Sequence, residues 1–493
     1  MAADRAFDAG RLAATVPPAE LVELVGADSA AGAAAPAIID ITHDSREVRP
    51  GWAFACIPGR TSDGHAFAAD AVAAGAAALL VERVLDVDVP QVVVRDVRRV
   101  LGPLAAAVHG NPALRLRTVG VTGTNGKTTT THLLGAILRA AGLTTHELGT
   151  LTGVRTTPEA TDLQRRLAEL VAGGVEAVVM EVSSHALALH RVAGMRFDVS
   201  VFTNLGRDHF DLHESVEEYF RAKASLFTPA LTDVGVVNFD DPYGQLLADV
   251  AEIETVGFSL ADADDVAVGL GAIDFAWRGH QVHVTLGGAF NVPNALAALT
   301  AAERLGIDAA TAIGGLAAST PVPGRFEVVS DDAVDPFSVV VDYAHTPDGL
   351  TSVLGAARAV APPNGRVVVV FGCGGDRDAD KRGLMGAAAV AGADVVVVTS
   401  DNPRHEEPAS IIDAIVAGID PRDRDAVVTE ADRRRAIALA LDVARPGDII
   451  VIAGKGHETT QTVGDQVRPF DDRTVARELL REKAGEPGEG GNP

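Results

Sequence analysis

The stretch from Val119 to Thr130 has the sequence VGVTGTNGKTTT. Its first residues form a short apolar segment, and an amphipathic segment at 132–141 predicts that a helix follows. A strand, a glycine loop and a helix N-terminus together form a phosphate cradle, because backbone N–H groups and the helix dipole attract negative charge. In such a cradle Lys127 reaches the outer phosphates and the Thr128 hydroxyl binds Mg²⁺.

The loop is shorter than the common phosphate-binding loop. That form has a glycine where this chain has Val121, and here Gly123 begins the loop instead. A plain turn that opens a helix would account for Gly123 and Gly126, but it would not account for the Lys-Thr pair that follows them. The stretch therefore predicts nucleotide binding.

Length and composition are typical of a multidomain globular protein. The chain has 493 residues, of which 47% are apolar, so we expect two to four domains. The two cysteines, Cys56 and Cys373, indicate neither a disulfide framework nor a metal ribbon. The net charge of −25 argues against nucleic acid as the main partner. No apolar run has the length of a membrane span and the N-terminus lacks the pattern of a signal segment, so we expect a cytoplasmic protein. We also expect a monomer.

Lysine is rare in this chain. Only five of the 42 basic residues are lysines, and four of the five lie in the motifs described below. A compact amine differs chemically from a planar guanidinium, so these lysines are candidates for positions where arginine cannot substitute.

Two turn-forming segments, 110–112 and 320–324, divide the chain into three α/β segments: 1–111, 112–322 and 323–493. Strands that alternate with helices predict largely parallel sheets, whose ligands collect at the carboxyl ends of the strands. The predicted strands are 38–41, 52–57, 77–81, 91–94, 119–122, 177–181, 199–203, 234–238, 339–342, 367–371, 395–399 and 449–453. The main predicted helices are 64–74, 129–141, 162–172, 216–227 and 295–304.

Polar residues follow the strands of the central segment. Glu181 ends an apolar strand and could hold Mg²⁺ or cap the next helix. Asp208 and His209 follow the next strand, and Lys223 shares a helix face with large apolar residues. Such a lysine usually extends its amine to solvent, but it could also carry a modification or face phosphate.

Other polar loops have two interpretations each. Asn291 and Asn294 could cap a helix or contact an adenine edge. Arg404 and Glu458 lie on loops at one sheet edge and could pair with each other or hold the two ends of a zwitterion. The loop at 44–46 and the loop at 58–65 could bind a diphosphate or simply face solvent.

Taken together, these motifs resemble the Mur ligase family, and within it the ligases that add the third residue of the muramoyl peptide. The resemblance extends from Asp44 to Asp472 and rests on nine motifs in family order. They are TGTNGKTTT, EVSSH, TNLGRDHFDLH, NVPNALAA, PGRFE, DYAHTPD, GCGGDRDADKR, DNPR and GKGHE.

The resemblance implies an N-terminal domain that binds a uridine diphosphate substrate, a central P-loop domain that binds ATP, and a C-terminal Rossmann-like domain. It also implies the reaction. ATP phosphorylates the D-glutamate side-chain carboxylate of UDP-N-acetylmuramoyl-L-alanyl-D-glutamate, and an amino acid's amine then attacks the acyl phosphate. Phosphoryl transfer needs mainly positioning and charge neutralisation, which a lysine, arginines and Mg²⁺ provide.

The resemblance assigns roles to individual residues. Lys127, Thr128 and Glu181 would serve the phosphates and a first Mg²⁺, and His209 and Lys223 a second Mg²⁺, with Lys223 as a carbamate. The remaining ATP residues would be Gly123, Thr124, Asn125, Gly126, Thr129, Asn291, Asn294, Arg325, Asp342 and His345. The UDP-muramoyl substrate would contact Ser45, Arg46, Thr156, Thr157, Ser183 and Arg191.

The DNPR motif implies that the amino acid is meso-2,6-diaminopimelate, whose far carboxylate Arg404 would pair with. The same end would contact Arg382, Asp401, Asn402, Gly454 and Glu458. One position departs from the family, since Leu189 stands where relatives often have glutamine. Three alternatives stay open: the same ligase with L-lysine, a folylpolyglutamate synthetase, and a non-enzymatic P-loop regulator.

Overall fold

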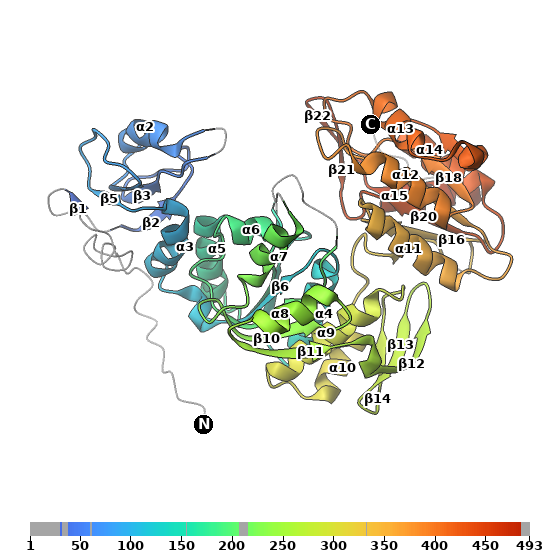
Figure 1. Cartoon of the computed structure of the whole chain (residues 1–493), viewed down its shortest axis with the longest axis horizontal. Helices are drawn as coiled ribbons and strands as arrows, with labels where there is room; N and C mark the ends of the chain where they lie inside the picture. The colour runs from blue at the N-terminus through green and yellow to red at the C-terminus, as the bar shows by residue number, and fades with distance from the viewer. Residues whose placement is uncertain are drawn as a thin grey trace.

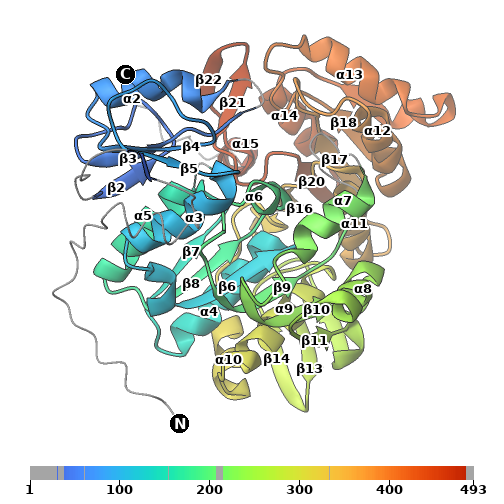
Figure 2. The same ribbon diagram turned by 60° about the vertical axis from the view of Figure 1, so that its left-hand side comes forward.

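The computed structural model describes residues 30–31, 38–59, 62–153, 155–206, 215–331 and 333–484. Within these ranges the chain forms three α/β units, each around its own sheet. Figure 1 shows the N-terminal unit at one end, the central unit in the middle and the C-terminal unit at the other end. Figure 2 shows the molecule turned by 60°, with the N-terminal and C-terminal units both above the central unit.

The N-terminal unit contains a five-stranded sheet in the order β1-β5-β4-β3-β2. All its neighbouring strands are parallel except the β1–β5 pair. The unit meets the central unit through Arg165 of α5, which donates a 2.8 Å hydrogen bond to Asp40 of β2 and lies over the ring of Trp52. The elements are β1 Ala30–Ala31, β2 Asp40–Thr42, β3 Trp52–Ala55, the 3₁₀ helix Gly64–Phe67, α2 Ala68–Ala73, β4 Ala78–Val81, β5 Gln91–Val93 and α3 Val97–Val108.

The central unit contains a six-stranded parallel sheet in the order β11-β10-β9-β6-β8-β7. Alternate residues of β8 enter two different cores. Val179 packs with α4 and α9, and Val178 packs with α5, as expected for a strand buried on both faces. The elements are β6 Arg117–Thr122, α4 Lys127–Ala140, β7 Thr145–Leu148, α5 Ala160–Ala172, β8 Ala177–Glu181, α6 Ser184–Ala188, β9 Phe197–Phe202, α7 Val216–Ala224, β10 Thr232–Asn238, α8 Pro242–Val250 and β11 Glu254–Phe258.

The central unit also includes a three-stranded antiparallel sheet and two further helices. The apolar side chains of this small sheet, such as Phe275 and Val282, complete the core on the α4 and α9 side. The elements are β12 Ala263–Val268, β13 Ile273–Trp277, β14 His280–Val284, α9 Asn291–Arg304 and α10 Ala309–Ala317.

The C-terminal unit contains a six-stranded sheet in the order β15-β16-β20-β17-β18-β19, parallel except for the short edge strand β15. A separate hairpin, β21–β22, follows the sheet. The elements are β15 Glu327–Val328, β16 Ser338–Asp342, α11 Pro347–Val360, β17 Val367–Phe371, α12 Lys381–Gly392, β18 Val395–Val398, α13 Pro408–Ala417, β19 Val427–Thr429, α14 Arg433–Val443, β20 Ile449–Ala453, β21 Thr460–Val463, β22 Gln466–Pro469 and α15 Asp472–Ala484.

Candidate functional site

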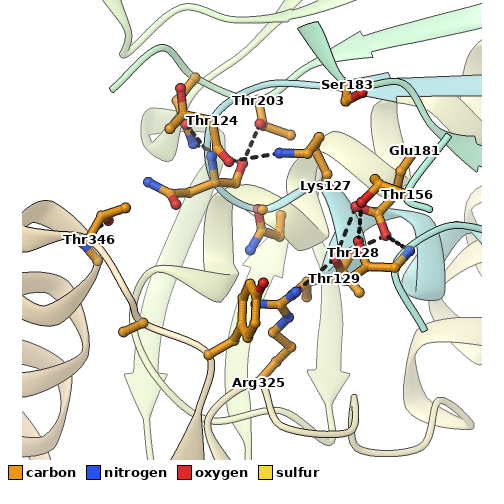
Figure 3. A pocket seen from close by; sticks show the side chains of 18 of the residues that line it. Thr124, Lys127, Thr128, Thr129, Thr156, Glu181, Ser183, Thr203, Arg325 and Thr346 are labelled. Carbon is orange, nitrogen blue, oxygen red and sulfur yellow. Dashed lines mark hydrogen bonds between the residues drawn. The ribbon is translucent and has the colours of Figure 1, made fainter. Parts of the chain in front are cut away.

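The loop between β6 and α4 is folded tightly around its glycines. Gly126 has φ +84°, and a Cβ atom there would lie 2.3 Å from Oδ1 of Asn294. Both the backbone conformation and this close contact disfavour any residue with a side chain. Lys127 opens α4 and donates hydrogen bonds to the carbonyls of Gly123, at 2.9 Å, and Thr124, at 2.8 Å. The loop therefore presents a helix N-terminus with a lysine at its mouth, as the sequence predicted (Figure 3).

Residues just after β9 fix the shape of this loop. The Thr203 hydroxyl donates to the carbonyl of Asn125 at 2.5 Å, and Oδ1 of Asn204 accepts from the backbone N–H of Asn125 at 2.9 Å. A Cβ atom at Gly123 would lie 1.9 Å from Oγ1 of Thr203. The sequence flagged the stretch from Asn204 onward but assigned no role to Thr203 or Asn204.

Glu181 and Thr128 form a pair of oxygen donors beside the loop. Oγ1 of Thr128 lies 3.1 Å from both carboxylate oxygens of Glu181, and the backbone N–H of Thr150 donates to the same carboxylate at 2.8 Å. Arg325 donates to the Thr128 hydroxyl at 3.1 Å. The alternative that Glu181 caps the next helix is wrong, because Ser183 is the N-cap of α6. Mg²⁺ prefers oxygen ligands next to phosphate, so the Thr128–Glu181 pair fits that ion.

Lys223 lies in the wall of the same site. Its side chain is 1% exposed, its ammonium donates to the carbonyl of Gly123 at 2.7 Å, and it lies 4.5 Å from the centre of the Tyr219 ring. The interpretation that Lys223 extends to solvent is therefore wrong. Asp208 and His209, its predicted neighbours in the site, lie outside the described residues.

Asn291 and Asn294 lie in the first turn of α9 rather than before it. The N-cap is Phe290, which makes no side-chain capping bond. The Asn291 amide donates to the carbonyl of Gly287 at 2.7 Å, and the Asn294 amide donates to Oδ1 of Asn291 at 2.9 Å. The capping interpretation is therefore wrong. Thr129, on the neighbouring helix α4, is buried and faces the same cavity as the two amides.

The C-terminal unit contributes a cation, a carboxylate and an aromatic group. The Arg325 guanidinium lies 4.3 Å from the centre of the Tyr343 ring, which in turn contacts the rings of His345, at 4.6 Å, and His457, at 5.0 Å. Burial raises the pKa of Asp342, although Arg325 opposes the rise. Burial also lowers the pKa of His457 to about 4, and the neighbouring Arg325 charge acts in the same direction.

The loops after β18 and β20 bring the DNPR and GKGHE motifs together. Arg404 has φ +51° and donates to the carbonyl of Gly375 at 2.7 Å. Glu458 accepts from the Asn402 amide at 2.8 Å and pairs with Lys455 at 3.1 Å. Within the described residues Glu458 thus pairs with Lys455 and not with Arg404. The interpretation of an Arg404–Glu458 ion pair is wrong.

Asp401 and Gly454 meet at the same point. Gly454 has φ +112°, and a Cβ atom there would lie 2.7 Å from Oδ2 of Asp401. Such a backbone conformation and such a close approach require glycine. The two motifs therefore form one surface although 53 residues separate Asp401 from Gly454 in the sequence.

Two arginines of the GCGGDRDADKR motif have different surroundings. Arg382, the residue assigned to the amino acid, is 6% exposed and pairs with Glu406 at 2.8 Å. It does not line the cavity described below, whereas Arg377 does. Arg377 lies in the loop before α12, which places it at the cavity wall, whereas Arg382 lies in the first turn of α12.

The residues assigned to the UDP-muramoyl substrate fall into two groups. The first group lines the cavity: Thr156, Thr157, Ser183 and Arg191. The second group, Ser45 and Arg46, belongs to the N-terminal unit and does not. Arg46 is 86% exposed and pairs with Asp44 at 2.5 Å. Leu189, the departure from the family pattern, ends α6 and is also absent from the lining.

One cavity of about 980 Å³ joins many of these residues, but Asp401, Asn402, Arg404 and Gly454 do not line it. The phosphate loop, Glu181 and Lys223 line it from the central unit. Arg325, Asp342, His345 and Glu458 line it from the C-terminal unit. The sequence did not assign Thr150, Arg155, Tyr343, Arg377 or His457, which also line the cavity.

Among the described residues, no helix is long and apolar enough to cross a membrane.

Three family models match the chain. The Mur ligase family catalytic domain matches residues 38–109, the Mur ligase middle domain residues 121–302, and the Mur ligase glutamate ligase domain residues 324–456. The phosphate loop and Glu181 lie in the second of these stretches, and Arg325, Asp342, His345 and Arg377 lie in the third.

Curated relatives match nearly the whole length. The chain is 44% identical to UDP-N-acetylmuramoyl-L-alanyl-D-glutamate--2,6-diaminopimelate ligase of Streptomyces coelicolor, over 96% of this chain and 98% of the relative. It is 45% identical to the protein of the same name from Geobacillus thermodenitrificans, over 91% of this chain and 96% of the relative.

Solved structures are similar as well. A structure of UDP-N-acetylmuramoyl-L-alanyl-D-glutamate--2,6-diaminopimelate ligase has a TM-score of 0.68 and 33% identity, covering 95% of this chain and 99% of that chain. The Mycobacterium tuberculosis folylpolyglutamate synthase complexed with ADP and AMPPCP has a TM-score of 0.59 at 19% identity, covering 78% of this chain and 94% of that chain. At that identity the second likeness concerns the fold alone.

Proposed function

Because the chain belongs to the Mur ligase family, we propose that it joins meso-2,6-diaminopimelate to UDP-N-acetylmuramoyl-L-alanyl-D-glutamate at the expense of ATP. The observation that carries this proposal is one cavity that the phosphate loop shares with residues of the C-terminal unit, among them Arg377 and Glu458. The γ-phosphoryl group of ATP passes to the side-chain carboxylate of D-glutamate and forms an acyl phosphate. The amine of the incoming amino acid attacks that carbonyl, loses a proton and displaces phosphate, so the products are an amide, ADP and phosphate.

The first step depends on positioning and charge neutralisation. Lys127 and the N-terminus of α4 hold the ATP phosphates, and the Thr128 hydroxyl and Glu181 would hold Mg²⁺. When bound, Mg²⁺ supplies positive charge at the phosphate oxygens. Arg325 reaches Thr128 from the C-terminal unit, so both units contact the region where the phosphoryl group moves.

Lys223 fits a role as a carbamate, formed when its amine adds to CO₂ and loses a proton. An ammonium buried to 1% exposure carries a desolvation cost, and a carbamate would replace that cation by two oxygen ligands. Its neighbour Gly123 belongs to the phosphate loop, so these oxygens would lie beside the phosphates. In this proposal Lys223 and His209 serve a second Mg²⁺.

Selectivity for diaminopimelate would come from Arg404. The loop holds this residue in a left-handed backbone conformation, which non-glycine residues adopt mainly where the surrounding structure fixes them. Its guanidinium would pair with the far carboxylate of diaminopimelate. L-Lysine has no carboxylate there and would leave the guanidinium unpaired in a closed site.

The substrates would also couple the units. We place the domain boundaries at 111/112 and 322/323, so ATP and the amino acid bind between the second and third domains. Binding in such a split site favours closure of one domain on the other.

The test is a phosphate-release assay with purified protein, ATP, Mg²⁺ and the UDP-dipeptide. We expect phosphate release with meso-diaminopimelate to be at least tenfold faster than with L-lysine. Arg404→Lys should reduce this preference, because an ammonium cannot pair bidentately with a carboxylate. Arg468→Lys, an exposed position on β22, is the matched control and should keep it.

Each alternative has its own outcome in this assay. Equal rates with the two amino acids would contradict diaminopimelate selectivity and favour the lysine-adding ligase. Phosphate release only with a folate and L-glutamate would favour a folylpolyglutamate synthetase. A protein that binds ATP but releases no phosphate with either acceptor would contradict the ligase reaction altogether.

A further inference from the structure

Lys455 is a fully buried lysine whose ammonium has three partners. Its side chain is 0% exposed. The ammonium donates to the carbonyl of Thr460 at 2.6 Å, to Oε2 of Glu458 at 3.1 Å and to Oδ1 of Asn402 at 3.4 Å. Three N–H groups thus meet three acceptors, and the charge is compensated by one carboxylate.

These contacts leave the two oxygens of Glu458 in different surroundings. Oε2 accepts from Lys455 and also from the Asn402 amide at 2.8 Å. No hydrogen bond from the described residues ends at Oε1. Glu458 lines the cavity, whereas Lys455 and Asn402 do not. The side chains of Lys455 and Asn402 therefore hold Oε2 of Glu458 on the side away from the cavity, and Oε1 is available to a ligand in the cavity.

Both the nitrogen and the oxygen of the Asn402 amide make hydrogen bonds inside the protein. Its amide nitrogen donates to Glu458, and its oxygen accepts from the backbone N–H of Thr462 at 2.9 Å as well as from Lys455. A backbone bond from Glu458 N–H to the Lys455 carbonyl, at 2.9 Å, closes the turn between them. Lys455 thus connects the DNPR loop, the GKGHE loop and the β21 strand at one point.

An arginine would not reproduce this arrangement. The pocket takes a compact ammonium with three acceptors around it, while a guanidinium is planar and larger. Of the 42 basic residues in the chain, 37 are arginines. The presence of lysine at position 455 is therefore consistent with a pocket that accepts an ammonium and excludes a guanidinium.

We propose that Lys455 is a positioning residue that fixes the Glu458 carboxylate so that Oε1 receives the distal ammonium of the incoming amino acid. The inference rests on the proposed function and deepens it. It divides recognition of the distal end between two groups: Glu458, set by Lys455, recognises the ammonium, and Arg404 recognises the carboxylate. Lys455 itself does not touch the substrate.

The experiment compares three amino acids as co-substrates of the full chain. meso-Diaminopimelate has both distal groups, (S)-2-aminopimelate lacks the distal ammonium, and L-lysine lacks the distal carboxylate. The variant is Lys455→Met, which keeps the length of the side chain and removes its charge. Lys483→Met, a half-exposed lysine on α15, is the matched control.

In the wild type, kcat/KM for meso-diaminopimelate should exceed that for each analogue. In Lys455→Met, kcat/KM for meso-diaminopimelate and for L-lysine should fall together, by about 10- to 100-fold, the effect expected when a charge-assisted hydrogen bond is lost. The value for 2-aminopimelate should change by less than about threefold, because that molecule has no distal ammonium to place. KM for ATP and KM for the UDP-dipeptide should also change by less than about threefold. The control variant Lys483→Met should have the same kinetic constants as the wild type.

A merely structural role would give a different pattern. If kcat/KM for 2-aminopimelate falls as far as that for meso-diaminopimelate, or if neither falls, the inference is overturned. If Lys455→Met is insoluble, Lys455→Gln keeps a donor without the charge and should show the same pattern at smaller size. A wild type that releases no phosphate with any of the three amino acids would overturn the proposed function itself, whereas an active wild type with an unaltered variant would overturn this inference alone.

Discussion

Several ion pairs join helices α14 and α15, and two of them differ strongly in burial. Arg433 and Asp472 form the first pair, at 2.7 Å, with both side chains 0% exposed. Arg434 and Glu478 form the second, at 2.5 Å, with side chains 39% and 48% exposed. We predict that Asp472→Asn strongly destabilises the C-terminal unit and that Glu478→Gln scarcely affects it.

The size of the destabilisation expected for Asp472→Asn follows from the burial of the ion pair and from the hydrogen bonds of Arg433. Besides both oxygens of Asp472, its guanidinium donates to the carbonyls of Ser400, at 3.1 Å, and Ala453, at 2.9 Å. Loss of one charge leaves the guanidinium uncompensated in the interior, which costs about 3–5 kcal/mol. Loss of an exposed pair costs about 0–1 kcal/mol. At about 1.4 kcal/mol per tenfold, the first change corresponds to a factor of roughly 140 to 3,700 in the opening equilibrium.

Hydrogen exchange measured by mass spectrometry can follow this unit separately from the other two. In Asp472→Asn the amides of β20, α14 and α15 should exchange faster by a factor in that range, because they exchange when the unit opens. Glu478→Gln should change the same amides by less than about fivefold. The double variant Arg433→Met/Asp472→Leu should recover most of the protection, since apolar side chains can replace a buried pair.

Similar protection factors in Asp472→Asn and Glu478→Gln would refute the reasoning, because they would mean that burial does not set the cost of breaking the pair. A double variant as unprotected as Asp472→Asn would refute the second step. It would show that the two carbonyl contacts of Arg433, rather than its charge, hold the loops after β18 and β20.

Three further predictions concern the site. Lys223→Ala should lose at least about a hundredfold in kcat and regain part of it with added short-chain carboxylic acid, which could replace the carbamate oxygens; full activity without the acid would contradict the carbamate. Gly126→Ala should weaken ATP binding at least about tenfold in calorimetry, because its Cβ would lie 2.3 Å from Oδ1 of Asn294 at a backbone φ of +84°; unchanged affinity would contradict the tight loop. His457 should titrate in NMR with a pKa of about 4, assigned with His457→Gln. Since its folded pKa lies below the ordinary value of about 6.5, the folded state should lose stability as pH falls from about 6.5 toward 4 and no further below that; a midpoint near 6.5 would contradict the burial of this imidazole.

The sequence predicted the central strands of the two larger sheets well, for a physical reason. Strands such as Val367–Phe371 and Ile449–Ala453 are buried on both faces and are therefore continuous apolar runs. Edge and antiparallel strands did not show this signal. β12 has the sequence ADDVAV and is largely exposed, and β21 is short and polar. Their place in the fold depends on partners elsewhere in the chain, which periodicity cannot reveal.

The candidate site was predictable to the level of loops and only partly to the level of side chains. Parallel strands bring their carboxyl ends to one edge, which is why motifs hundreds of residues apart share a cavity. The direction of each side chain depends on its neighbours. The helix pattern alone favoured a solvent-exposed amine at Lys223, but the residue is buried, because α7 packs it against the phosphate loop. The sequence did not single out Arg377, which lines the cavity from the loop before α12, whereas Arg382, assigned to the amino acid, lies in the first turn of α12 and pairs with Glu406.

The charge of the cavity explains how a strongly acidic chain can bind anionic substrates. The chain carries a net charge of −25, yet the described residues that line the cavity include six basic and three acidic side chains, or five and four once Lys223 is a carbamate. The basic ones are Lys127, Arg155, Arg191, Lys223, Arg325 and Arg377, and the acidic ones are Glu181, Asp342 and Glu458.

At physiological ionic strength charges separated by more than about 8 Å are largely screened, so the lining outweighs the distant surface charge. Burial also raises the pKa of Asp342, which lowers the cost of protonating one of the three acids. Two of the basic side chains, Arg325 and Arg377, come from the C-terminal unit. The full positive field therefore exists only while the two units flank the same cavity, and an anionic substrate that binds there favours the closed arrangement in which the phosphoryl group and the amino acid meet.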